Sequence, residues 1–177
     1  ILPWEARSKT LERLVSSPVE VWAILLGDVF ASFVFGLAIS LIPLGVAVLM
    51  GVEVVHTLVF CLGMILATIC FASLSILLSV YPPTDVPATV MMLSSLVRFP
   101  LVFISGVFVP VEEMPAWGQT IASASPLTYF IDLARYSTTG ISYYSLPIDL
   151  AVLVIFTLLF LVVSIKLHER FLPQRLS

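Results

Sequence analysis

Long apolar runs separated by short polar joints make up most of this chain. Four runs are long enough to cross a hydrocarbon layer of about 30 Å, which takes around 20 helical residues. They cover residues 22–50, 54–80, 86–109 and 148–167. Because only closed hydrogen-bonded elements such as helices can span lipid, the pattern predicts an all-α, polytopic membrane protein. We expect residues 1–177 to form a single transmembrane domain.

A shorter pattern precedes the first apolar run. Residues 5–16 form an amphipathic helical pattern with Leu11 and Leu14 on its apolar edge. Ser17 can cap the next helix and Pro18 suits its first position, so the short helix must end just before them. Such a helix fits the membrane surface, either as a simple juxtamembrane anchor or as a docking element. The pattern alone leaves both interpretations open.

The segment 110–147 is too interrupted to span the membrane. Pro115 and the pair Ser125-Pro126 each begin a short helix of about ten residues, or ~15 Å, which is half a bilayer. In the second helix Asp132 and Arg135 lie three residues apart and can pair. Two apolar-striped half-helices predict a re-entrant hairpin that dips into the outer leaflet. A helical cap lying flat on the membrane fits the same periodicity.

Composition excludes a soluble globular domain. Hydrophobic residues make up 60% of the chain and charged residues 11%, and the mean hydropathy is +1.14. A soluble domain carries roughly 25% charged residues, so lipid must solvate much of this surface. No basic cluster suggests a nucleic-acid partner.

The distribution of basic residues predicts the orientation. Four crossings place both chain ends on one side, and six basic residues lie there against only Arg135 on the other side. Cytoplasmic segments carry the excess of lysine and arginine, so we expect a multi-pass protein of the cell membrane with both ends cytoplasmic. The segment 110–147 is then outside. The six residues are Arg7, Lys9, Arg13, Lys166, Arg170 and Arg175.

The sequence contains no recognisable motif for nucleotide binding, metal binding or hydrolysis. No glycine is followed by lysine, so the chain has no G-x-x-x-x-G-K-[ST] loop for binding ATP. His56 and His168 are isolated, and we expect no metal site. Serines occur in the apolar runs, but no histidine shares their depth to act as a base, which disfavours an intramembrane hydrolase. We therefore expect no catalytic residue and no cofactor bound by this chain.

Arg98 lies near the middle of the third apolar run. A charge at that depth costs at least about 2.5–3.5 kcal/mol, so an ionisable residue there is a functional candidate by default. Two structural interpretations compete with that one. Arg98 can face the other helices and bond carbonyls freed near Pro100, or a shifted helix can let it reach the membrane surface.

The order of these pieces resembles the permease subunits of type-2 ATP-binding-cassette exporters. The first matching stretch is similar to the family's cytoplasmic pattern E-x-x-x-G-T-L-E-x-L-x-x-S-P. The stretches follow the family order over most of the chain and are jointly specific. They are Glu5-Ala-Arg-Ser-Lys-Thr-Leu-Glu-Arg-Leu-Val-Ser-Ser-Pro18, then Ser105-Gly106-Val-Phe-Val-Pro110 with Met114-Pro115-Ala-Trp117, and finally Pro126-Leu127-Thr128-Tyr129 followed by Asp132 and Arg135.

The resemblance implies a role for two segments. Residues 5–16 would be the coupling helix, which contacts a cytoplasmic ATPase subunit that binds ATP and Mg²⁺. The segment 110–147 would be a re-entrant gate over the exit, and a second permease copy, identical or different, would complete the pathway. The implied coupling residues are Glu5, Thr10, Leu11, Glu12, Leu14, Ser17 and Pro18. The implied gate residues are Gly106, Pro110, Pro115, Trp117, Pro126, Thr128, Tyr129, Asp132 and Arg135.

Two departures from the family pattern qualify the resemblance. Lys9 stands where the family usually has glycine, which is expected to alter the docking contact without removing it. The family has six spans, whereas this chain begins at the coupling helix. We therefore expect the chain to be the C-terminal portion of a permease.

The preferred function from sequence is the membrane subunit of an ATP-driven exporter. A membrane anchor or assembly subunit that only recruits a cytoplasmic partner is the alternative. The apolar spans and the short external segment favour a lipophilic substrate such as a drug or a lipid-like molecule. Polysaccharide, haem-related compounds and ions are not excluded.

Overall fold

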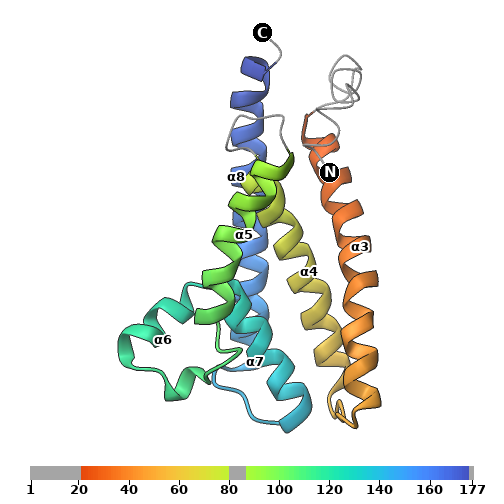
Figure 1. Ribbon diagram of the computed structural model, residues 1–177, viewed down its shortest axis with the longest axis vertical. Helices are drawn as coiled ribbons and strands as arrows, with labels where there is room; N and C mark the ends of the chain where they lie inside the picture. Colours follow the sequence, from red (N-terminus) through yellow and green to blue (C-terminus); the bar gives the residue numbers. More distant parts are fainter. Residues whose placement is uncertain (1–20, 80–86, 176–177) are drawn as a thin grey trace.

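The computed structural model describes residues 21–79 and 87–175, and every regular element in this part of the chain is helical (Figure 1). The predicted all-α class is therefore confirmed for these residues. The long helices are α3 (Val21–Leu49), α4 (Thr57–Ser79), α5 (Pro87–Ile104) and α8 (Leu146–Arg175). Between α5 and α8 lie η1 (Val111–Glu113), α6 (Ala116–Ser123) and α7 (Pro126–Thr139).

Three of the helices, α3, α4 and α8, are long and apolar enough to cross a membrane. The prediction for the first run, 22–50, agrees with α3 to within one residue at each end. The last run, 148–167, lies inside α8, which begins two residues earlier and continues through the more polar tail to Arg175. The start of α3 and the end of α8 lie at the same end of the bundle (Figure 1). The predicted coupling helix, 5–16, lies outside the described residues.

The third apolar run forms a shorter helix than the sequence predicts. Helix α5 ends at Ile104, although the apolar run continues to residue 109. Gly106 adopts a φ of +89°, a left-handed conformation that breaks the helix and that side chains other than hydrogen strongly disfavour. The 18 residues of α5 span about 27 Å, slightly less than a typical hydrocarbon layer.

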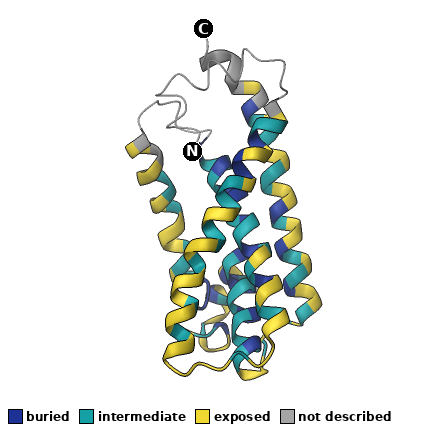
Figure 2. Cartoon of the chain, turned by 90° about the vertical axis from the view of Figure 1, so that its right-hand side faces the viewer, coloured by how far each residue is buried: buried dark blue, intermediate teal, exposed yellow. Residues whose placement is uncertain are grey.

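Helix α4 lies at the centre and contacts α3, α5, α7 and α8. Leu25 and Val29 of α3 form one buried apolar cluster with Ala72 and Ile76 of α4. Much of the outer surface of the long helices is exposed (Figure 2), and many of the exposed residues are large and apolar. An outward apolar surface is what a helix needs in lipid, since the acyl chains take the place of a protein neighbour.

Glycines allow α4 to lie close to its neighbours. A Cβ atom at Gly63 would lie 3.2 Å from Cδ1 of Leu133 in α7, and one at Gly36 of α3 would lie 2.7 Å from Cγ2 of Thr68. Both distances are shorter than ordinary van der Waals contact. Small residues therefore set the spacing of α4 from α3 and from α7, as is common between membrane helices.

The segment 110–147 contains the two predicted short helices. Pro115 and Ser125 occupy the N-cap positions of α6 and α7, which have 8 and 14 residues. Ser125 is the N-cap residue of α7, but its side chain makes no capping hydrogen bond. Its hydroxyl is buried and has no hydrogen-bond partner among the described residues.

Helix α7 packs against α4 and α8 instead of projecting from the bundle. Leu133 is fully buried and joins Tyr129 and Leu153 of α8 in a second apolar cluster. The amide of His56, in the loop before α4, donates to the carbonyl of Ser137 at 3.0 Å. Helix α7 is thus held along its length by protein contacts.

Candidate functional site

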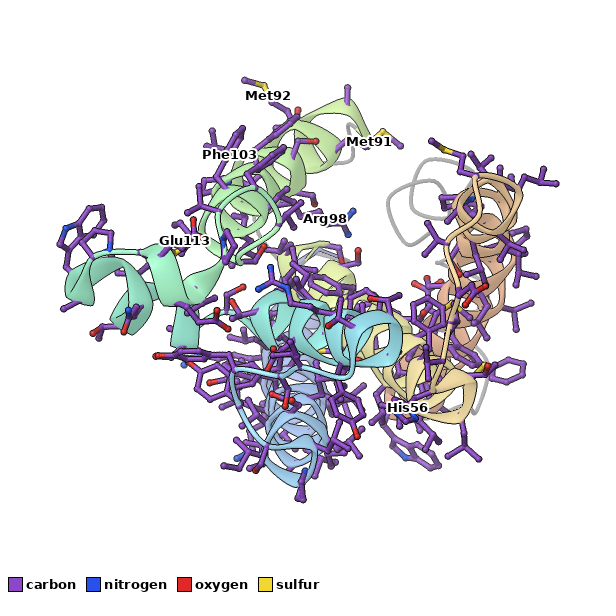
Figure 3. The ribbon with its side chains drawn as sticks, turned by 90° about the horizontal axis from the view of Figure 1, so that it is seen from below. His56, Met91, Met92, Arg98, Phe103 and Glu113 are labelled. Carbon is purple, nitrogen blue, oxygen red and sulfur yellow. The ribbon has the colours of Figure 1, made fainter. Side chains whose placement is uncertain are left out.

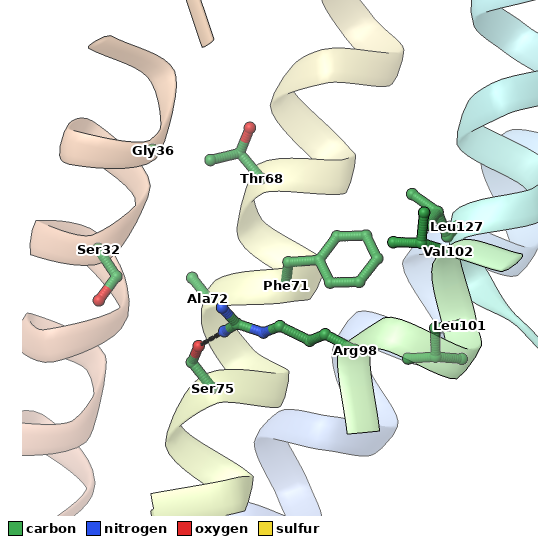
Figure 4. Close-up of a pocket in the computed structure, with 10 residues that line it drawn as sticks. All are labelled: Ser32, Gly36, Thr68, Phe71, Ala72, Ser75, Arg98, Leu101, Val102 and Leu127. Carbon is green, nitrogen blue, oxygen red and sulfur yellow. Dashed lines mark hydrogen bonds between the residues drawn. The ribbon is translucent and has the colours of Figure 1, made fainter. Parts of the chain in front are cut away.

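A cavity of about 430 Å³ lies between α3, α4 and α5, and α7 reaches its edge (Figure 4). Its volume is within the range of small-molecule sites, roughly 300–1,000 Å³. Helix α4 supplies the wall between the other two long helices. The lining residues are Ser32 and Gly36 of α3, Thr68, Phe71, Ala72 and Ser75 of α4, Arg98, Leu101 and Val102 of α5, and Leu127 of α7.

Among the residues that the structure describes, Arg98 is the only charged one that lines this cavity. Its side chain extends from α5 towards α4, whereas Met92 points away from the bundle (Figures 3 and 4). One guanidinium nitrogen donates a hydrogen bond to the hydroxyl of Ser75. The sequence left open a bond to carbonyls near Pro100, but the structure gives Arg98 a side-chain partner on the neighbouring helix.

The other cavity-lining residues divide into a polar side and an apolar side. Thr68 donates its hydroxyl to the carbonyl of Met64, one turn earlier in α4. Ser32 has no hydrogen-bond partner among the residues that the structure describes. The apolar side consists of Phe71 on α4, Leu101 and Val102 on α5, and Leu127 on α7.

Four of the predicted gate residues come together in a second, much smaller crevice. Gly106, Thr128, Asp132 and Arg135 all line it, although they lie up to 29 positions apart in the chain. Its volume is about 10 Å³, roughly the space that one water molecule needs. The crevice is therefore a packed joint between α7 and the segment after α5, and is too small to hold a substrate.

Asp132 connects α7 to the loop that leads into α8. Its two carboxylate oxygens accept hydrogen bonds from the amides of Tyr143 and Tyr144 at 2.8 and 2.7 Å. Arg135 donates instead to the carbonyl of Gly106 at 3.5 Å. The predicted pairing of Asp132 with Arg135 is wrong, since each side chain takes a backbone partner from a different segment.

The remaining predicted gate residues lie apart from one another. Pro126 is buried, and Tyr129 lies in the apolar cluster, where its hydroxyl donates to the carbonyl of Ser123 at 2.7 Å. Pro110 precedes η1, whereas Pro115 and Trp117 are exposed. Pro126 and Tyr129 belong to the start of α7, whereas Pro110 precedes η1 and Pro115 and Trp117 lie at the start of α6, so the five residues do not converge on one site.

Sequence reasoning missed two residues near these features. Ser75 accepts a hydrogen bond from Arg98 because α4 packs against α5. Nothing in the sequence indicates that these two residues, 23 positions apart, are in contact. Asp149, in the first turn of α8, is fully buried, and neither of its carboxylate oxygens has a hydrogen-bond partner among the described residues. Its position at the very start of an apolar run is the sequence signal that could have singled it out.

The predicted coupling residues Glu5, Thr10, Leu11, Glu12, Leu14, Ser17 and Pro18 lie outside the residues that the structure describes.

Comparison with known proteins gives a family match over most of the chain. Residues 2–139 match the ABC-2 type transporters. The chain is 26% identical over 163 residues to the inner membrane transport permease YadH of Escherichia coli strain K12, which covers 92% of this chain and 63% of YadH. It is also 38% identical over 80 residues to the putative transport permease ycf38 of Porphyra purpurea, covering 45% of this chain and 27% of that protein.

A similar match links the chain to the ycf38 permease of Pyropia yezoensis, with 33% identity over 87 residues, 49% of this chain and 29% of that protein. The chain thus spans less than two thirds of the length of these relatives. No solved structure matches it.

Proposed function

The chain belongs to the ABC-2 type transporter family, and we propose that it acts as the membrane permease of an ATP-driven exporter. The family match from residue 2 to residue 139 carries this proposal, because it covers the segment proposed to couple, the three long helices α3, α4 and α5, and residues 110–139 of the proposed gate. The relatives named as transport permeases point in the same direction.

The substrate would enter the cavity between α3, α4 and α5 and leave past α7. Leu127, in the first turn of α7, already lines the cavity. A movement of α7 relative to α4 and α5 would therefore change the end of the cavity. The segment 110–147 would act as a re-entrant gate on the outer side, with both chain ends in the cytoplasm.

The energy for this movement would come from a separate ATP-binding subunit, the partner that the family implies. A cytoplasmic ATPase would bind ATP and Mg²⁺ and act on residues 5–16. A second permease copy would face the first across the pathway. Transport would then follow from rigid-body rearrangement of helices, with no covalent chemistry by this chain.

Co-purification tests this proposal most simply. The full-length protein is expressed with candidate ATP-binding-cassette ATPases from the same organism, and any complex is isolated through a tag on the permease. We expect one of these ATPases to co-purify and its hydrolysis to rise when a lipophilic substrate is added. The variants Glu12→Ala and Leu14→Ala should keep the permease folded but separate ATP hydrolysis from transport, whereas Lys166→Gln should behave as wild type.

The outcomes separate the exporter from the anchor. An ATPase that co-purifies, but whose rate does not respond to any substrate, would favour a membrane anchor or assembly subunit. A permease that binds no ATPase, or Glu12→Ala and Leu14→Ala complexes that export normally, would contradict the coupling assignment.

A further inference from the structure

The cavity between α3, α4 and α5 contains a positive charge without a matching negative one. Arg98 is charged, and none of the other nine lining residues that the structure describes is acidic. Asp28, the acidic residue of α3, lies one turn before Ser32 and is not part of the lining. Arginine stays charged in proteins, so the described lining carries a net charge of +1.

We propose that this cavity binds the anionic group of an amphipathic molecule. A carboxylate or phosphate would lie against the guanidinium of Arg98, and the apolar body would lie along α5 and α7. A guanidinium has five N–H donors in a planar fork that matches both anions, and the bond to Ser75 occupies only one of its nitrogens.

Two serine hydroxyls extend the anion site. Ser75 accepts the hydrogen bond from Arg98, so the hydrogen of its own hydroxyl is available to an anion. Ser32 on α3 has no hydrogen-bond partner among the described residues and lines the same cavity. The cation and both hydroxyls therefore come from three different helices, and a bound anion would connect α3, α4 and α5.

The apolar side of the cavity suits the rest of such a molecule. Phe71, Leu101, Val102 and Leu127 lie on the side away from Ser32. A single charge at membrane depth is costly, and an anion on the guanidinium would offset that cost more strongly in lipid than in water. A neutral or cationic amphiphile would leave Arg98 uncompensated, so the site discriminates by charge.

This inference names the substrate class of the proposed exporter and to that extent rests on it, but binding itself can be measured without ATP. The probe is a fluorescent fatty acid, 12-(dansylamino)dodecanoic acid, compared with its methyl ester. The two share the apolar body and differ in charge. Full-length protein is reconstituted in phosphatidylcholine nanodiscs, and binding is followed by the dansyl emission.

The variants then test the role of the charge. Wild-type protein should bind the acid more tightly than the ester, and Arg98→Gln should lose about tenfold or more in affinity for the acid while keeping its affinity for the ester. Arg98→Lys keeps the charge but lacks the planar fork, so its loss should be smaller. Lys166→Gln removes an exposed cation of α8 outside the cavity and should change neither affinity.

Two results would overturn the proposal. One is equal affinity of the wild-type protein for the acid and for the ester. The other is an Arg98→Gln protein, monodisperse on gel filtration, that binds the acid as tightly as wild type does. The latter would mean that Arg98 is compensated by another part of the transporter.

A second lipid composition identifies the source of the anion. If phosphatidylglycerol in the nanodiscs weakens acid binding by wild type but not by Arg98→Gln, the site takes an anionic membrane lipid. If it has no effect on wild type, the site selects a free amphiphile. Failure of charge selectivity alongside a co-purifying, substrate-stimulated ATPase would remove this site and leave the exporter in place. Charge-selective binding without any ATPase partner would support this site and contradict the exporter function.

Discussion

Replacing Asp132 by alanine should loosen the joint between α7 and α8. Asp132 is only 6% exposed, so water cannot readily replace its two bonds to the amides of Tyr143 and Tyr144. A hydrogen bond to a charged group contributes about 1.5–3 kcal/mol, so losing both should lower the free energy of unfolding by roughly 3–6 kcal/mol. Asp132→Asn keeps one acceptor oxygen, and its loss should be about half as large.

The measurement uses a buried thiol in this part of the bundle. Cys70 is fully buried and Cys61 is exposed, so a Cys61→Ser background leaves Cys70 to report unfolding by a thiol-reactive dye during heating. The control is Glu113→Ala, which removes an exposed acid from the same segment and should change stability by less than about 0.5 kcal/mol. If Asp132→Ala unfolds at the same temperature as Glu113→Ala, Asp132 does not hold the loop.

Three further substitutions, with Gly45→Ala as a control for Gly36→Ala, test the contacts of α4 and α7 with the same assay. Gly36→Ala should destabilise by about 1–3 kcal/mol because its Cβ would lie 2.7 Å from Thr68. Gly45→Ala, with nothing within 4 Å, should be neutral or stabilising, and equal effects at both glycines would contradict the close approach of α3 to α4. Leu133→Ala, at a fully buried position, should cost about 2–5 kcal/mol, and a near-zero cost would mean that α7 is not packed on α4 and α8. Tyr129→Phe removes the 2.7 Å bond to Ser123 and should cost only about 0.5–1.5 kcal/mol, so a loss as large as that of Leu133→Ala would contradict this assignment.

The helices were predictable where the sequence marks their ends. Pro115 and the pair Ser125-Pro126 mark the starts of α6 and α7, because proline suits the first helical turn and disfavours a preceding helical residue. The end of α5 was not predictable from hydropathy. Residues 107–109 continue the apolar run, and only the positive φ of Gly106 shows that the helix has already ended.

The site was less predictable than the fold, because its contacts join residues that are distant in the chain. Arg98 stood out in the sequence as a charge within an apolar run, but its bond to Ser75 depends on how α4 and α5 pack. The same holds for Asp132, whose spacing from Arg135 suggested a local pair although its oxygens bind the amides of Tyr143 and Tyr144. Local spacing shows which side chains can meet on one helix. It does not show that two backbone amides of the loop before α8 would donate to the carboxylate of Asp132.

Vectorial transport by the complete complex tests the account most directly. Inside-out membrane vesicles that contain the full-length permease and its ATPase are mixed with the dansyl fatty acid, and its accumulation inside the vesicles is measured with and without ATP. We expect uptake that requires ATP hydrolysis and that falls about tenfold in Arg98→Gln, while Lys166→Gln transports normally. Uptake that is the same without ATP, or unchanged in Arg98→Gln, would contradict the account.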